Sequence, residues 1–88
     1  MPRTPDLVRA ATLLEAGDWQ AAHAIVQEDD SALACWGHGI VHIMEGDLSN
    51  ARYWYRRARR RFPVSGSVAG EIAALRDRIT KQAEAKAR

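Results

Sequence analysis

The sequence has little of what disulfide-bonded, zinc-knuckle and membrane proteins are built from. Its 88 residues include a single cysteine, Cys35, which excludes an internal disulfide and a cysteine-rich metal site, so we expect a small buried thiol. No apolar run reaches the length of a signal peptide or of a membrane span. Glycine and proline are few and mostly stand at apparent boundaries, which favours helices. These absences predict a small all-α protein that is cytoplasmic and does not bind a membrane.

The charges are unevenly divided along the chain. Residues 1–50 carry two arginines against eight acids, a net charge of −6, and residues 51–88 carry eleven basic residues against three acids, a net charge of +8. The overall charge of +2 hides this difference. Such asymmetry indicates either an acidic protein partner or self-association in which unlike halves meet, which leaves a homodimer open.

Capping residues and helix breakers divide the chain into five expected helices. Asp18, Ser31 and Asp47 each stand where an N-cap is expected, and Gly17 and Gly46 stand where the preceding helix should end. Apolar residues recur at helical spacing between these signals. The expected helices cover residues 5 to about 16 (with Thr4 as the N-cap), 19 to about 28, 32–45, 48–62 and about 67–87, with Pro63 and a short linker before the last.

Two stretches of the chain are alike. "LLEAGDWQAAHAIV" (13–26) and "HIMEGDLSNARYWY" (42–55) align at an offset of 29, with Gly17-Asp18 falling on Gly46-Asp47, and two such units in tandem are typical of a repeat protein. The second unit resembles a tetratricopeptide repeat (TPR). The residues that match that family's pattern are Gly39, Gly46, Leu48, Ala51, Tyr55, Ala58 and Pro63. The match departs at Cys35, His38 and His42. Separately, "EGDLSNARYWYRRA" (45–58) resembles a segment of small, uncharacterised bacterial proteins, which implies no activity.

The TPR resemblance implies an all-α fold and a binding role. Residues 1–88 would form one domain, with two antiparallel helix–turn–helix repeats (about 3–31 and 32–65) and a capping helix (about 67–87) in a short right-handed α-solenoid. It also implies a non-catalytic protein-interaction module whose partner lies on a concave apolar face. The residues expected on this concave face are Leu7, Leu14, Trp36, Ile40 and Ile43. A face this apolar should not be exposed to water. We expect either the capping helix or a second copy of the chain to cover it.

The fourth helix has two different sides. An inner face is expected from the spacing of Leu48, Ala51, Tyr55, Ala58 and Phe62. The remaining side and its flanks carry a candidate partner-binding set of Tyr53, Trp54, Arg56, Arg57, Arg60 and Arg61. Tyrosine, tryptophan and arginine often anchor interfaces, although an exposed arginine run is most often only solvated. An alternative function is nucleic acid binding by this helix, but no nucleic-acid fold is recognisable and the first half of the chain is acidic.

One histidine cluster offers a third alternative. His38, His42 and Glu45, at positions i, i+4 and i+7, lie on one side of a helix, where two histidines can share a metal ion, with His23 or Asp47 as a further ligand. The competing interpretation is a pair of partly buried histidines hydrogen-bonded to Tyr55, Asn50 or backbone. The sequence contains neither a phosphate-binding loop nor the Glu after His38 that a zinc protease motif needs. We therefore expect no catalytic residues, no bound cofactor and no enzymatic activity.

Overall fold

The protein is built from helices, as the sequence predicts. The structure is a computed structural model that describes residues 4–63 and 67–86. Its helices are α1 (Thr4–Glu15), α2 (Trp19–Val26), α3 (Ala32–Glu45), α4 (Leu48–Arg57) and α5 (Val68–Lys86), and the described residues include no strand. The all-α prediction is confirmed. Most of the predicted linker, residues 64–66, and the predicted end positions 3 and 87 lie outside the described residues.

The predicted starts of α2, α3 and α4 are confirmed by their capping hydrogen bonds. The side chains of Asp18, Ser31 and Asp47 accept hydrogen bonds from the backbone N–H three residues later, at 3.1, 3.2 and 3.4 Å respectively. These bonds satisfy donors that the first helical turn leaves unpaired. Gly17 and Gly46 end α1 and α3 with positive φ angles of 83° and 92°, a conformation that glycine adopts at little cost.

Two predicted helix ends are wrong. Helix α2 ends at Val26, and α4 ends at Arg57, five residues before the predicted end at Phe62. At the end of α4, Arg59 has a φ of 57°, and its N–H and that of Arg60 bond to the carbonyls of Arg56 and Tyr55, each at 3.0 Å. This Schellman motif also closes α1 and α3, but there the left-handed residue is glycine. Because position 59 is not a glycine, the sequence contains no local signal for the end of α4.

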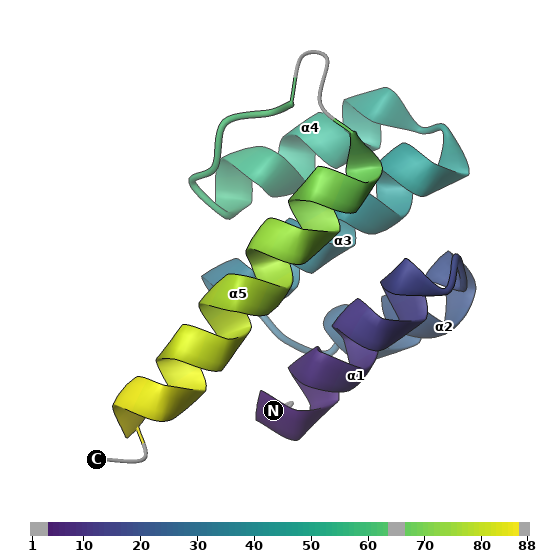
Figure 1. Cartoon of the computed structure of the whole chain (residues 1–88). Helices are drawn as coiled ribbons and strands as arrows, with labels where there is room; N and C mark the ends of the chain where they lie inside the picture. The colour runs from purple at the N-terminus through teal and green to yellow at the C-terminus, as the bar shows by residue number, and fades with distance from the viewer. Residues whose placement is uncertain (1–3, 64–66, 87–88) are drawn as a thin grey trace.

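The helices form two hairpins bridged by the last helix. Helix α1 packs on α2, α3 packs on α4, and α2 packs on α3, while α5 lies across α1 and α3 (Figure 1). The described helices include none that is both long enough and apolar enough to span a membrane.

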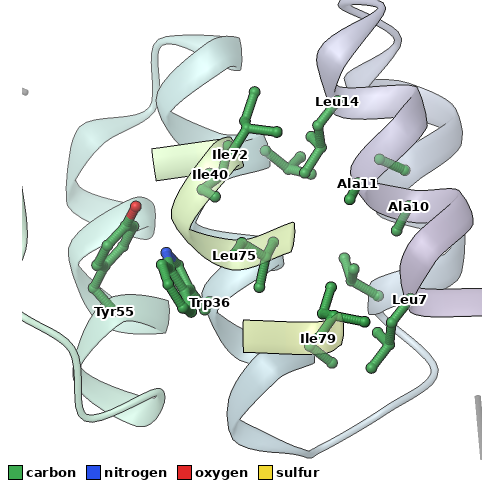
Figure 2. Packing of buried hydrophobic residues seen from close by; sticks show 14 residues of the cluster. Leu7, Ala10, Ala11, Leu14, Trp36, Ile40, Tyr55, Ile72, Leu75 and Ile79 are labelled. Carbon is green, nitrogen blue, oxygen red and sulfur yellow. The ribbon is translucent and has the colours of Figure 1, made fainter. Parts of the chain in front are cut away.

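Helix α5 covers the predicted concave apolar face. Figure 2 shows Ile72, Leu75 and Ile79 of α5 between the α1 side chains and Trp36 of α3. All three isoleucine and leucine side chains of α5 are buried. Of the two coverings that the sequence left open, the structure therefore has the capping helix rather than a second copy. The buried apolar area supplies the main stabilisation of the fold.

Helices α3 and α4 approach closely at Gly39. A Cβ atom built on Gly39 would collide with ring carbons Cδ1 and Cε1 of Tyr55, the latter at 2.6 Å. The predicted inner face of α4 is correct at Ala51 and Tyr55, which are buried, and wrong at Leu48, which is 49% exposed. Leu48 begins α4 at its first turn, outside the close contact that Gly39 permits.

Candidate functional site

An arginine-lined pocket lies where α3, the end of α4 and α5 meet. Its volume is about 230 Å³. We call it the arginine pocket; its lining is Ala32, Leu33, Trp36, Ala58, Arg59, Arg60, Arg61 and Arg78. The lining combines four guanidinium groups with an apolar part from the first turns of α3, and it contains no acidic residue.

Glu71 fixes one side of this pocket by holding Arg60. The Glu71 carboxylate accepts two hydrogen bonds from Arg60, at 3.2 and 3.1 Å, one from Tyr55 Oη at 2.7 Å and one from Trp36 Nε1 at 3.2 Å. The Arg60 guanidinium also stacks over the Trp36 ring, 3.7 Å from its centroid. Burial alone would raise the pKa of Glu71, but the hydrogen bonds from Arg60, Tyr55 and Trp36 and the charge of Arg60 bring it below its usual value. Arg60 therefore has an internal structural role.

The other three arginines of the pocket are available to a ligand. Arg59, Arg61 and Arg78 are exposed, and no carboxylate of residues 4–63 or 67–86 forms an ion pair with them. Arg59 is held toward the pocket by the left-handed turn that ends α4, and Arg78 comes from α5, seventeen residues beyond Arg61. The sequence did not predict Arg59 and Arg78 as members of this site. Arg59 was expected inside a continuous helix, and Arg78 reaches the pocket only because α5 packs beside α3 and the end of α4.

The predicted partner-binding set is divided between two places. Arg60 and Arg61 line the arginine pocket, whereas Tyr53, Arg56 and Arg57 lie exposed on α4 and do not line it. Arg57 is engaged within its own helix, because its guanidinium donates to Tyr53 Oη at 3.1 Å. We call Tyr53, Arg56 and Arg57 the outer face of α4.

Trp54, the remaining member of that set, faces inward. Its ring is half-buried and stacks on the His38 imidazole with 3.8 Å between centroids and 9° between planes. This placement removes Trp54 from the exposed side of α4.

The predicted concave-face residues are largely inaccessible. Leu7, Leu14, Trp36 and Ile40 are buried in the core beneath α5, so they cannot form an open groove in this conformation. Ile43 is half-buried and lines a second pocket of about 210 Å³. The other residues that line this second pocket are Ile40, Leu48, Arg52, Phe62, Pro63, Val68 and Glu71.

The histidine candidates of α3 meet a third histidine from α2. His23 Nε2 lies 3.1 Å from His38 Nε2, and His42 stacks on His38 with 5.0 Å between ring centroids. Glu45 contacts His42, with Oε1 2.7 Å from Nδ1. The interpretation that Tyr55 binds these histidines is wrong, because Tyr55 donates its hydroxyl to Glu71.

Burial shifts the pKa of His38 and of the single thiol, Cys35. The pKa of His38 is lowered to about 4, first by burial and then by the nearby rings of His23 and His42, so His38 is neutral at pH 7. Burial likewise raises the pKa of Cys35, which confirms the predicted buried thiol and leaves no activated nucleophile there.

Comparisons with protein-family models, with curated proteins and with solved structures find no match for this chain. The arginine pocket and the histidine cluster are therefore interpreted from their own chemistry.

Proposed function

We propose that this domain is a non-catalytic interaction module of TPR type that binds an acidic segment of a partner protein in the arginine pocket. The observation that carries the proposal is the gathering of Arg59, Arg61 and Arg78 around one pocket without a described carboxylate to pair with them. Guanidinium groups bind carboxylates through paired, charge-assisted hydrogen bonds. Three of them around one hollow suit a ligand with several carboxylates.

The apolar part of the pocket favours a peptide over a bare anion. Leu33 and Ala58 are half-buried beside the guanidinium groups and offer contact to aliphatic side chains. Buried aromatic and apolar contacts surrounded by charge are typical of protein-interaction sites. An acidic segment that also carries leucine or a similar residue would satisfy both parts of the lining.

The backbone at Arg59 adds support for a binding role. A left-handed conformation costs a non-glycine residue on the order of 1 kcal/mol, and Gly17 and Gly46 avoid that cost at the other two helix ends of this kind. Strained residues of this type concentrate at functional sites. An arginine at this position is explained if its guanidinium is needed in the pocket.

The proposal is tested with short fluorescent peptides and anisotropy. One peptide is rich in Glu, Asp and Leu, and its control has Gln and Asn in place of the acids; a single-stranded DNA of equal charge is the third probe. The acidic peptide should bind, and the neutral peptide should not. Preference for the DNA, with a steep loss of affinity as salt rises, would instead support nucleic acid binding.

Two charge-matched variants locate the site. The pocket variant is Arg59→Glu/Arg61→Glu/Arg78→Glu, and the control on α4 is Arg52→Glu/Arg56→Glu/Arg57→Glu. The pocket variant should bind the acidic peptide about a hundredfold more weakly or worse, because each lost charge-assisted hydrogen bond contributes on the order of 1.5–3 kcal/mol. The α4 variant should lose far less. The proposal fails if the two variants behave alike, or if the pocket variant binds as the wild type does.

Self-association is a separate outcome that the same proteins can reveal. The acidic half of a second copy, residues 1–50 with a net charge of −6, has the charge that the pocket requires. Light scattering across a concentration series would detect such a dimer. A dimer that the pocket variant abolishes would identify a second copy as the partner.

A further inference from the structure

Every histidine of the chain lies in one cluster. The sequence has three, and one ring nitrogen from each of His23, His38 and His42 lies within 4.8 Å of the others. His23 comes from α2, whereas His38 and His42 come from successive turns of α3. The cluster therefore joins the first helical hairpin to the second.

The spacing of these nitrogens suits a transition-metal ion. In a tetrahedral site with metal–nitrogen bonds of about 2.0–2.1 Å, two ligating nitrogens are about 3.4 Å apart. The His23 and His38 Nε2 atoms are already 3.1 Å apart. Since no pair exceeds 4.8 Å, the third nitrogen needs to approach by little more than about 1 Å to complete the triad.

Glu45 prepares His42 to act as a ligand. Its carboxylate oxygen lies 2.7 Å from His42 Nδ1, and since that oxygen accepts, Nδ1 carries the proton. The lone pair of His42 is then on Nε2, which is left for a metal. A carboxylate on the far nitrogen of a ligating histidine is the usual arrangement at protein metal sites, where it fixes the tautomer and the ring orientation.

The surroundings also prepare His38. Trp54 stacks on its ring at 3.8 Å and fixes the ring plane.

From these contacts we propose that His23, His38 and His42 bind one Zn²⁺ ion, with Glu45 orienting His42 and the fourth coordination position left to water. Three neutral imidazoles form a ligand set that suits zinc, and an open fourth position is typical of three-histidine sites. The bound ion would cross-link α2 to α3. The proposal is independent of the arginine pocket, which shares no residue with it.

The experiment uses untagged, chelator-treated protein, because a histidine tag would bind the same ion. Titration with Zn²⁺ alone by calorimetry should give one ion per chain, and the midpoint of thermal unfolding should rise with Zn²⁺ concentration. Titration with Co²⁺ should give the intense visible bands of a four-coordinate ion. Absence of one-to-one binding would overturn the proposal.

Four variants test the proposed site through two of its ligands, the orienting carboxylate and a control residue. His23→Gln and His38→Gln should each weaken Zn²⁺ binding more than about 100-fold, and Glu45→Gln about 10–100-fold, the usual cost of losing an orienting carboxylate. Asp47→Asn is the matched control: Asp47 lies near His42 and Glu45 but not in the triad, and Asn keeps the helix cap. It should bind Zn²⁺ as the wild type does.

The variants remain informative if they are less stable. Circular dichroism of the metal-free proteins establishes that each variant is helical at the titration temperature. His23→Gln should destabilise the fold least, because His23 is only half-buried. Undiminished Zn²⁺ affinity in a helical His23→Gln protein would refute the triad. Loss of binding in Asp47→Asn would equally overturn it, since the site would then be His42, Glu45 and Asp47.

Discussion

Replacing Gly39 by alanine tests the close packing of α3 against α4. The added Cβ would lie 2.6 Å from Tyr55 Cε1, closer still to Cδ1, and 3.4 Å from the Ala51 carbonyl oxygen. Tyr55 has little room to retreat, because it is 1% exposed and its hydroxyl donates to Glu71 at 2.7 Å. The collision must therefore be relieved by moving the two helices apart.

The expected magnitude follows from two opposing effects. Overpacking a close-packed interior typically costs about 1–3 kcal/mol, and contacts this short belong at the upper end. Alanine is favoured over glycine inside a helix by about 1 kcal/mol, which offsets part of that cost. We expect Gly39→Ala to lower the free energy of unfolding by about 2 kcal/mol, which for a domain of this size lowers the thermal midpoint by roughly 8–16 °C.

Urea and thermal unfolding monitored by circular dichroism measure this change, with Gly70→Ala as the control. A Cβ on Gly70 meets only Ser67 Oγ, at 3.9 Å, so that variant should gain roughly 0.5–1 kcal/mol. In a Tyr55→Leu background the Gly39→Ala penalty should shrink, since the two residues are in contact. The reasoning is refuted if Gly39→Ala is as stable as the wild type, or if its penalty is independent of Tyr55.

Three further substitutions follow from the described contacts. Glu71→Gln should lower the free energy of unfolding, measured in urea, by on the order of 3 kcal/mol, because it removes the largely buried charge partner of Arg60. A loss below about 1 kcal/mol would contradict this. For His38, a folded pKa of about 4 against an unfolded value of 6.5 means that the unfolded chain binds more protons between these pH values. For the metal-free protein, the free energy of unfolding should then fall by about 3 kcal/mol from pH 7 to pH 4, at 1.36 kcal/mol per pKa unit. The fall should be smaller in His38→Gln; the same dependence on pH in the variant and the wild type would contradict the role of His38. Arg59→Gly should raise the free energy of unfolding by roughly 1 kcal/mol, as strain is relieved, and weaken acidic-peptide binding about tenfold; lower stability would argue against strain at this turn.

Local signals predicted most of the secondary structure. The caps at Ser31 and Asp47 and the stop at Gly46 are determined by residues within one helical turn, so the predicted bounds of α3 and the start of α4 are confirmed. The end of α4 was missed because a non-glycine residue, Arg59, takes the left-handed position. The contacts that Arg60 then makes with Glu71 are tertiary and leave no mark in the local sequence.

The sites depend on packing, and the sequence predicted them only in part. Helical spacing brought His38, His42 and Glu45 together, but it could not show that His23 of α2 lies against His38 or that Glu45 orients His42. The arginine run pointed to a basic surface. It could not show which arginines pair internally, nor that Arg78 of α5 completes the pocket.

The most direct test of the acidic-segment proposal is a heteronuclear NMR titration of the labelled, metal-free protein with the acidic peptide. If the account is right, the amide signals that shift will cluster at residues 32–33, 58–61 and 78, which line the arginine pocket. The Arg59, Arg61 and Arg78 side-chain signals should shift with them. Shifts confined to the outer face of α4, or no shifts at peptide concentrations that saturate binding in the anisotropy assay, would contradict it.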